Sequence, residues 1–228
     1  MHTDAGADAH TLGRSWTPRS SRGAAPRGRD TVVTPSGATV CRVSSHPLFV
    51  RAARPTEAAE IAWLAALTFP LACPPGTPVA TMAAHIARHL SPRRVAGWID
   101  DPARETVVAL AGPEVVGYAL LVHGSPDGEA EADVLREAAG PGPYVELSKI
   151  YVHPDRLGDG TAHALLTGAL EAGERLAPEA SPWLGTNGAN HRAQTFYRKH
   201  GFEVVGERTY DVGGVQHADV VMLRPPGI

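Results

Sequence analysis

The stretch from Tyr144 to Leu166 constrains the fold of this chain more than any other. Its first part, up to Val152, is an almost continuous apolar and aromatic run, which is typical of a central strand. Gly158 and Gly160 then keep side chains out of a turn, and apolar residues recur at helical spacing on one face from Ala162 onward. A glycine-bearing turn that opens a helix presents unpaired backbone N–H groups at the positive end of the helix dipole. The stretch therefore predicts a phosphate site.

Composition narrows the class of protein. The 228 residues suffice for one domain with a substantial core, and 43% hydrophobic and 20% charged residues are ordinary for a globular chain. The formal charge of -3 favours neither a nucleic-acid partner nor a membrane surface. No apolar run reaches the roughly 18 residues of a membrane helix, and the N-terminus lacks the apolar block of a signal peptide. We therefore expect a cytoplasmic protein with no membrane contact.

A metal site is not expected. Cys41 and Cys73 are the only cysteines, too few for a disulfide framework or a cysteine-based zinc site. His85 and His89 lie four residues apart, but no third ligand lies nearby in the sequence. We interpret this pair as packing or solvent-facing histidines.

The first 46 residues differ from the rest. They are rich in Gly, Ala, Ser, Pro and Arg and show no apolar periodicity, so they bury too little surface to offset the entropy lost on ordering. We expect a disordered N-terminal tail over residues 1–46 and one folded domain over residues 47–226. A basic arm for an acidic partner is the alternative interpretation of the tail, and a short ordered piece from Thr31 to Val43 stays open.

The remaining chain alternates between strand and helix patterns. Besides Tyr144–Val152, strands are expected over Leu48–Ala52, Thr106–Ala111, Val115–Val122, Pro182–Thr186, Phe202–Arg208 and Val215–Leu223. Besides the helix from Ala162, helices are expected over 55–68, 77–90, 93–100, 130–138 and 190–200, with Phe69-Pro70 breaking the first and Met82, Ala83, Ile86 and Ala87 inward in the second. The fold class is therefore α+β, a single domain with a mixed, largely antiparallel sheet flanked by helices.

The glycine turn alone does not identify a nucleotide fold. A Walker A motif requires Gly-Lys-Ser/Thr, whereas Thr161 and Ala162 follow Gly160. A Rossmann fold needs its glycine motif near the start of a parallel sheet, whereas this turn follows strands joined by hairpins. Neither motif fits.

A second block, from Asn190 to Phe202, reads N-x-x-A-x-x-F-Y-x-x-x-G-F. Asn190, Ala193 and Tyr197 recur at i, i+3 and i+7, which places an amide, a small residue and a phenol on one helix stripe. Together with the glycine turn, this block resembles the GCN5-related N-acetyltransferase (GNAT) superfamily, whose members bind acetyl-coenzyme A. The resemblance covers roughly Leu48 to Pro225 in element order, and it implies the GNAT fold and N-acetyltransferase activity.

The resemblance also implies where acetyl-CoA would bind. The family motif Gln/Arg-x-x-Gly-x-Gly/Ala corresponds here to residues 157–162, where Leu157 and Asp159 depart from the usual residue types and would weaken pyrophosphate binding. We therefore expect backbone N–H groups to hold the phosphates, with Asn190 bonding the pantetheine arm and backbone N–H groups of the central strand polarising the thioester carbonyl. The implied cofactor-binding residues are Ile150, Tyr151, Val152, Leu157, Gly158, Asp159, Gly160, Thr161, Ala162, Asn190 and Ala193.

Two side chains are candidates for the chemistry that the resemblance implies. The acceptor amine must be neutral to attack a thioester, so a base has to remove its proton. Glu146 stands where some family members place a base glutamate, and its alternative role is a counter-ion for the amine. Tyr197 is the candidate acid that protonates the departing thiolate, and its alternative role is a packed helix aromatic.

The acceptor is the least constrained part of the prediction. The segments ELSKIYVHP, WLG and NHRAQTFYRKHGFEVVGERTYDVGG are similar to the PaiA-like branch of bacterial polyamine acetyltransferases, which implies a cationic acceptor. The acidic segment from Asp127 to Glu137 carries charge that a polyamine would favour, or is simply a solvated loop. We expect transfer of acetyl from acetyl-CoA to a primary amine, with a small polyamine-like acceptor slightly preferred. A protein N-terminus or lysine, an antibiotic amine, a module that binds acetyl-CoA without turnover, and a homodimer all stay open.

Overall fold

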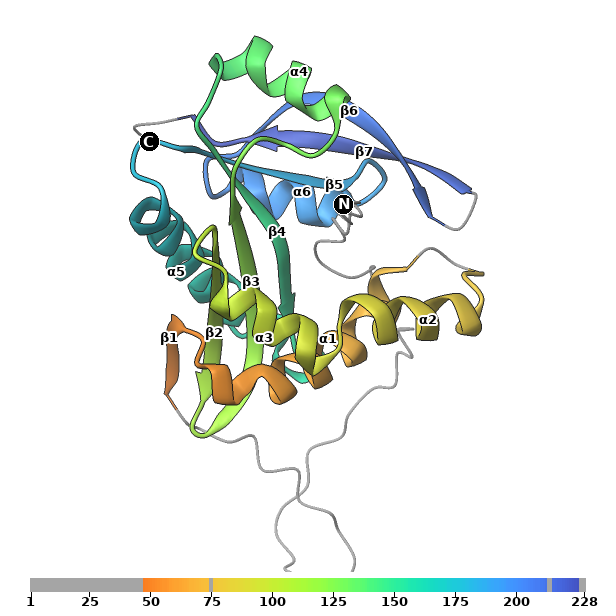
Figure 1. The fold of residues 1–228 in the computed structure, drawn as a ribbon, viewed down its shortest axis with the longest axis vertical. Helices are drawn as coiled ribbons and strands as arrows, with labels where there is room; N and C mark the ends of the chain where they lie inside the picture. The colour runs from red at the N-terminus through yellow and green to blue at the C-terminus, as the bar shows by residue number, and fades with distance from the viewer. Residues whose placement is uncertain (1–46, 74–75, 213–214, 226–228) are drawn as a thin grey trace, which may run out of the picture.

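The computed structural model describes residues 47–73, 76–212 and 215–225. One sheet of seven strands runs through it in the order β1-β2-β3-β4-β5-β7-β6 (Figure 1). The strands are β1 (Leu48–Ala52), β2 (Arg104–Ala111), β3 (Glu114–His123), β4 (Tyr144–Val152), β5 (Ser181–Asn187), β6 (Glu203–Val212) and β7 (Val215–Leu223). The helices are α1 (Ala58–Ala72), α2 (Val79–His89), α3 (Pro92–Asp100), α4 (Glu129–Ala139), α5 (Thr161–Leu176) and α6 (His191–Arg198), with 3-10 turns at Pro55–Glu57 and Pro154–Arg156. Every neighbouring pair of strands is antiparallel except β4 and β5, so the expected mixed, largely antiparallel sheet is confirmed.

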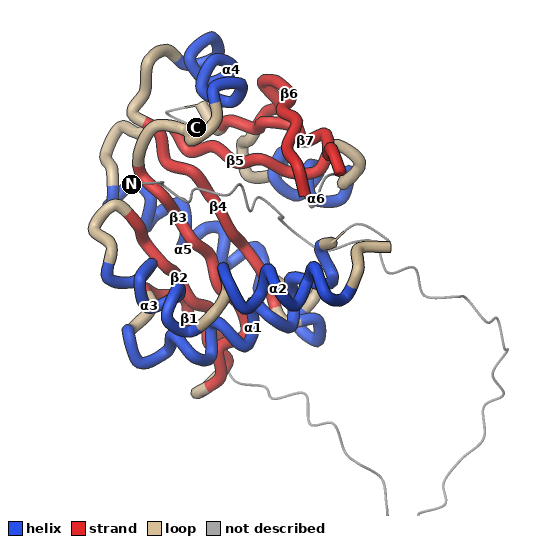
Figure 2. The backbone as a smooth tube through the Cα atoms, turned by 45° about the vertical axis from the view of Figure 1, so that its right-hand side comes forward, coloured by secondary structure: helices blue, strands red, loops and turns tan. Residues whose placement is uncertain are grey.

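The parallel pair β4–β5 divides the sheet. Its register contains only Tyr144 with Ser181, Val145 with Pro182, and Glu146 with Trp183. Beyond these pairs β5 turns away from β4, as Figures 1 and 2 show, and the described residues form no further pairing between them. We call the point just after Glu146 and Trp183 the fork.

A β-bulge lies in β4 next to the fork. Leu121 of β3 pairs with Leu147, whereas Leu120 pairs with Lys149, so Ser148 is the extra residue on β4. A bulge bends its strand and increases the local twist. The bend falls where β4 leaves β5, so it contributes to the separation of the two strands.

The two faces of the sheet bury different cores. On one face, α5 and α6 cover an apolar cluster that includes Leu147, Ile150 and Val152 of β4. On the other face, α1 and α3 cover a cluster that includes Tyr151 of β4, while α4 covers the part of the sheet formed by β6 and β7 (Figure 2). Because side chains alternate along a strand, Glu146 shares the second face.

One helix end differs from the sequence expectation. We expected Phe69-Pro70 to end the first helix near Thr68, but α1 continues through Pro70 to Ala72. Proline lacks an N–H, so Pro70 costs α1 the hydrogen bond to the carbonyl four residues earlier, and only two residues of the helix follow it. Phe69 is buried and stacks on His85 of α2 with 4.3 Å between ring centroids, which holds this last part of α1 in place.

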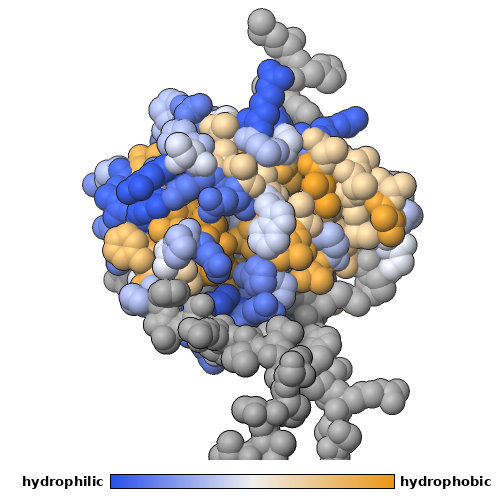
Figure 3. All heavy atoms as spheres, turned by 90° about the horizontal axis from the view of Figure 1, so that it is seen from below, coloured by the Kyte–Doolittle hydropathy of each residue, from blue (hydrophilic) through white to orange (hydrophobic). Residues whose placement is uncertain are grey.

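The helix α2 packs less completely than its sequence suggested. Of the residues expected to face inward in α2, Met82 and Ile86 are half-buried, but Ala83 and Ala87 are exposed, because α2 contacts the domain through α1 alone among the elements with substantial contact. Figure 3 shows the surface from the end of the molecule where α1 lies, with hydrophobic patches between hydrophilic ones. The exposed apolar side chains of α1 are Trp63, Leu67 and Leu71.

Several expectations fall outside what the structure describes, or concern absences. The expected tail over residues 1–46 lies outside the described residues. Within the described ranges no helix has the length and apolar character needed to cross a bilayer. The described residues also contain no group of three or more His, Cys, Asp or Glu placed to hold a metal ion, and His85 packs against Phe69 and His89.

Candidate active site

The free edge of β4 beyond the fork offers backbone donors. The His153 N–H donates to the Val116 carbonyl of β3 at 2.8 Å. Successive N–H groups along a strand point to opposite edges, so the Tyr151 N–H also points toward β3. The N–H groups of Ile150 and Val152 therefore point to the edge that β5 has left. Of the three expected backbone donors, these two face the fork and Tyr151 does not.

The turn before α5 has the backbone that its glycines allow. Gly158 and Gly160 have φ of 91° and 94°, a region that side chains strongly disfavour. A Cβ added at either position would meet no atom within 4 Å. The surface of the turn is therefore open to a ligand at the N-terminus of α5, as the phosphate hypothesis requires.

Asp159, the acidic residue in this turn, is neutralised within the turn. Its Oδ1 accepts the Thr161 N–H at 2.9 Å, and its Oδ2 forms an ion pair with Arg156 Nε at 2.9 Å. Burial raises the pKa of the Asp159 carboxyl, but the hydrogen bonds with Thr161 and the charge of Arg156 outweigh burial and leave the pKa below its usual value. The expected repulsion of a phosphate is thus smaller than the sequence suggested. The Thr161 N–H, however, is already engaged by Asp159, and Leu157 is 53% exposed.

The stripe on α6 differs in detail from the expected one. Asn190 does not lie in the helix but caps it, because its Oδ1 accepts the Ala193 N–H at 3.1 Å. Ala193 and Tyr197 are fully buried on the side of α5 and α6, and the Tyr197 ring packs edge-on against Phe202 with 5.8 Å between centroids. The Asn190 oxygen thus has a structural task besides any contact with pantetheine.

Two buried hydroxyls test whether the site fits acetyl-CoA. Thr186 lies on β5 beyond the fork, paired with Val220, which packs against the α5 and α6 core. Thr161 begins α5. Both side chains are buried, and the Thr186 hydroxyl has no hydrogen-bond partner among the described residues. Donors on β4, buried hydroxyls at both ends and an open glycine turn fit an elongated ligand with carbonyl, amide and phosphate groups.

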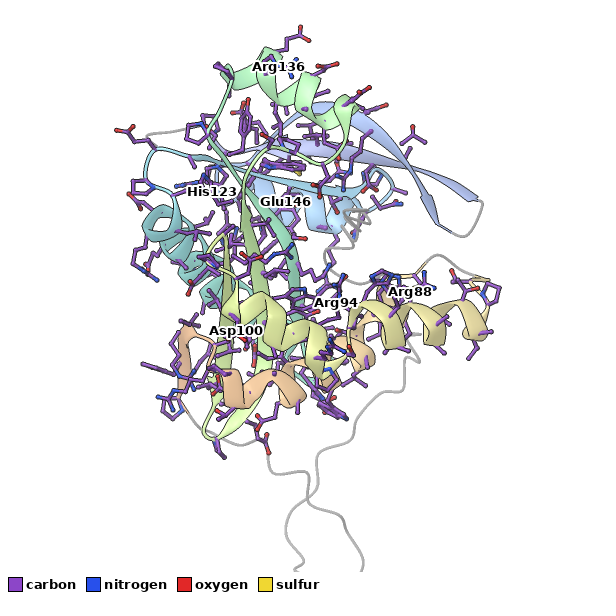
Figure 4. All side chains as sticks on the ribbon, viewed as in Figure 1. Arg88, Arg94, Asp100, His123, Arg136 and Glu146 are labelled. Atoms are coloured by element: carbon purple, nitrogen blue, oxygen red, sulfur yellow. The ribbon has the colours of Figure 1, made fainter. Side chains whose placement is uncertain are left out.

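Glu146 occupies the last pair before the strands separate, and Figure 4 shows it where β4 meets β5. Its side chain is half-buried. Burial raises the pKa of its carboxyl above the usual value, and the charges of Arg208 and Lys149 oppose this rise. Asp127 and Glu131 reinforce it. A carboxylate with a raised pKa is a better proton acceptor, which suits the expected base.

The sequence prediction missed a set of buried charges next to Glu146. Arg208 of β6 is 5% exposed, and its Nη1 lies 3.1 Å from Glu131 Oε1 of α4. Its Nη2 lies 3.5 Å from Asp219 Oδ2 of β7, and Asp219 is 1% exposed. Burial raises the pKa of Asp219 to about 7, although Arg208 opposes the rise. Only the pairing of β6 with β7 and the placement of α4 bring these side chains together. A charged residue inside an apolar strand such as VQHADVVML is the one signal that the sequence offers.

Comparisons with known proteins identify the family of the chain. The model of the acetyltransferase (GNAT) family matches residues 81–202, more than half of the chain. Proteins described as uncharacterised N-acetyltransferases of Mycobacterium tuberculosis and Mycobacterium bovis are 38% identical over 169 residues, which span 74% of this chain and 97% of each relative.

Solved structures share the fold at low sequence identity. The PaiA N-acetyltransferase from Thermoplasma acidophilum in complex with coenzyme A has a TM-score of 0.58 and 16% identity, covering 78% of this chain and 98% of that one. Arabidopsis thaliana NAA60 in complex with a bisubstrate analogue has a TM-score of 0.58 and 13% identity, covering 78% and 97%. These likenesses confirm the expected fold, and the family match and the mycobacterial relatives together establish that the chain belongs to the acetyltransferase (GNAT) family.

Proposed function

We propose that this protein transfers acetyl from acetyl-CoA to a primary amine, with a small polyamine-like acceptor preferred. The observation that carries the proposal is the fork. Glu146 lies at the fork on the face of α1, α3 and α4, whereas Tyr197 comes from α6 on the opposite face. An amine and a departing thiolate need a proton acceptor and a proton donor at different places, which this separation supplies.

The protein's own groups have separate tasks in the proposed reaction. Bound acetyl-CoA supplies the acetyl thioester, as it does in the acetyl-CoA complex of the NAA60 neighbour. The Glu146 carboxylate accepts a proton from the ammonium form of the acceptor, so that a neutral amine attacks. The N–H groups of Ile150 and Val152 donate to the carbonyl oxygen as its negative charge grows. The Tyr197 hydroxyl gives its proton to the sulfur that leaves, and the proton that the new amide nitrogen loses restores the hydroxyl.

The phosphates are proposed to bind at the glycine turn. The residues that would contact them are those of the turn from Leu157 to Ala162, with the backbone of Gly158 and Gly160 open on the surface. Arg156, which directly precedes this turn, pairs with Asp159 and offsets its negative charge beside the site. Asn190 and Ala193, at the start of α6, would lie along the pantetheine arm.

Two acidic residues near Glu146 support a cationic acceptor, although the nearby cations Arg208 and Lys149 oppose them. Asp127 and Glu131 add negative charge on the face from which the amine would approach. The acidic segment as a whole gives weaker support than expected, since Glu131 pairs with Arg208 and Asp133 pairs with Arg136. The PaiA N-acetyltransferase structure, at 16% identity, supports the fold alone.

A thiol-release assay across an amine panel tests the proposal. Release of coenzyme A with spermidine supports the small-amine acceptor, whereas release only with peptides supports a protein acceptor. Release only with aminoglycosides supports an antibiotic amine. Acetyl-CoA binding by calorimetry without release on any amine would indicate a binding module, and no binding at high micromolar acetyl-CoA would refute the cofactor assignment.

A further inference from the structure

Arg208 is a buried cation that the proposed reaction leaves unused. Its guanidinium lies over Gly185 of β5, where an added Cβ would come within 2.3 Å of Nη2. Glu131 and Asp219 hold it through ion pairs at 3.1 and 3.5 Å, and its guanidinium carbon lies 5.9 Å from the centroid of the Trp183 ring. Burying a charge is costly unless the charge is paired. These contacts together hold the Arg208 guanidinium in one position.

Close contacts at two glycines hold Glu131, the ion-pair partner of Arg208, in place. A Cβ at Gly206 of β6 would come within 2.6 Å of Val134 Cγ1, so α4 packs directly on this strand. A Cβ at Gly128, which caps α4, would come within 2.3 Å of Glu131 Oε2. Glycines on two elements thus permit Glu131 to reach a strand 77 residues away in sequence.

Arg208 and Glu146 share one neighbour, the Trp183 side chain. Trp183 pairs with Glu146 at the fork, and the same ring lies under Arg208. The other residue that pairs with Glu146, Val122 of β3, carries no charge.

The remaining charged groups around Glu146 come from several elements. Lys149 of β4 is 5% exposed, and its Nζ lies 5.7 Å from the Trp98 ring of α3. Asp127 precedes α4, and Glu131 lies on it. Arg208 is the stronger of the two cations that lower the pKa of Glu146, and Asp219, which itself titrates near neutral pH, contacts Arg208.

We propose that Arg208 is a positioning residue for acetyl transfer, because its guanidinium, seated over Gly185 by Glu131 and Asp219 and beside Trp183, supplies positive charge that favours the ionised form of Glu146 at the fork. The proposal rests on the proposed function, in which Glu146 accepts the proton of the amine. The proposal predicts that the two members of the Arg208–Glu131 ion pair have opposite effects on the ionisation of Glu146. Arg208 favours the ionised Glu146, whereas the charge of Glu131 disfavours it.

The pH dependence of kcat/KM separates this role from a purely structural one. In Arg208→Gln, the acidic limb of the profile should move to higher pH. At pH values below the limb, kcat/KM should fall roughly three- to tenfold relative to wild type, and at pH values above the limb the two proteins should become equal. In Glu131→Gln, which keeps a hydrogen-bond acceptor for Arg208, the limb should move to lower pH. Arg208→Lys keeps the charge and should restore most of the wild-type profile. If the ion pair only anchors α4, both Gln variants lose thermal stability and neither moves the limb, or both move it the same way.

A measurement without cofactor or acceptor keeps the two proposals distinct. The Glu146 carboxyl carbon is followed by NMR titration of the ligand-free protein, with its resonance assigned through Glu146→Gln. A titration midpoint that rises in Arg208→Gln and falls in Glu131→Gln supports the role of Arg208, whatever the activity. Midpoints that stay unchanged overturn it. If Arg208→Gln does not fold, the direction of the Glu131→Gln shift decides. An acidic limb that persists in Glu146→Gln refutes Glu146 as the base and leaves the NMR result standing.

Discussion

At the scale of single residues, the site is defined by what each side chain can do with a proton. Glu146 is half-buried among charges of both signs, whereas Tyr197 is fully buried among aromatic rings. Part of the Glu146 side chain thus reaches the surface, while Tyr197 is shielded from bulk water. These environments match a group that accepts a proton from an incoming amine and one that releases a proton inside a closed site.

Replacing Glu146 by Gln should lower kcat by about a hundredfold at neutral pH, because the amine loses its proton acceptor. Raising the pH should restore part of the rate, since hydroxide then deprotonates the amine in solution. Steady-state kinetics between pH 6 and 10 provide the check, with the exposed Glu129→Gln as the matched control. A defect in Glu146→Gln that is independent of pH would assign Glu146 to amine binding instead.

Tyr197→Phe keeps the ring and removes only the hydroxyl, so the packing against Phe196 and Phe202 is preserved. We expect turnover to fall by about tenfold or more with little change in the dissociation constant of acetyl-CoA. Rapid kinetics and calorimetry on the same preparation measure the two quantities. An unchanged turnover would remove Tyr197 from the mechanism.

At the scale of elements, periodicity predicts what a segment forms, and packing decides where it ends. The expected strand Tyr144–Val152 is confirmed residue for residue, because its apolar run is continuous and both of its faces are buried. The end of α1 was mispredicted, since the local penalty of Pro70 is outweighed by the burial of Phe69, a tertiary contact. The residue spacing predicts Asn190 on the helix stripe, whereas in the structure it caps α6. An N-cap residue bonds the N–H three residues later, and this is also the spacing of neighbours on one helix face, so the sequence pattern does not distinguish the two positions. The cluster around Arg208 depends on strand register, which no local pattern encodes.

Gly185 and Gly97 provide opposite outcomes for the same substitution. Gly185→Ala places a methyl group 2.3 Å from the Arg208 guanidinium and should destabilise the fold by about 1–3 kcal/mol. Gly97 lies inside α3, where a Cβ would meet no atom within 4 Å, so Gly97→Ala should stabilise by about 0.5–1 kcal/mol. Urea unfolding of both variants gives the comparison. If Gly185→Ala were as stable as the wild type, Arg208 would have adjusted to the methyl group at little cost.

At the scale of the whole molecule, the buried charges make stability depend on pH. The pKa of Asp219 is raised to about 7, above the value expected in the unfolded chain. The folded state therefore binds a proton that the unfolded state has lost between those values, and folding stability falls as the pH rises toward 7. Above that pH the whole cost of an ionised, buried Asp219 is present.

Asp219→Asn should remove this cost. We expect a rise in Tm of about 5 °C at pH 8 and a much smaller change at pH 4, where the wild-type carboxyl is already protonated in the folded state. Thermal unfolding followed by circular dichroism at both values measures the difference. A lower Tm at pH 8 would show that the ion pair with Arg208 outweighs the burial of the carboxylate.

The short seam between β4 and β5 also has a consequence for hydrogen exchange. Amides of a central strand are ordinarily among the slowest to exchange in a protein. Here the amides of β4 should alternate beyond the fork, with Tyr151 protected by β3 and with Ile150 and Val152 exchanging far faster. Exchange measured by NMR should show this alternation in the ligand-free protein and lose it when a ligand fills the fork. The exchange rates of the Ile150 and Val152 amides in β4 would then show whether a ligand occupies the fork, whereas the amides of the outer strands would not.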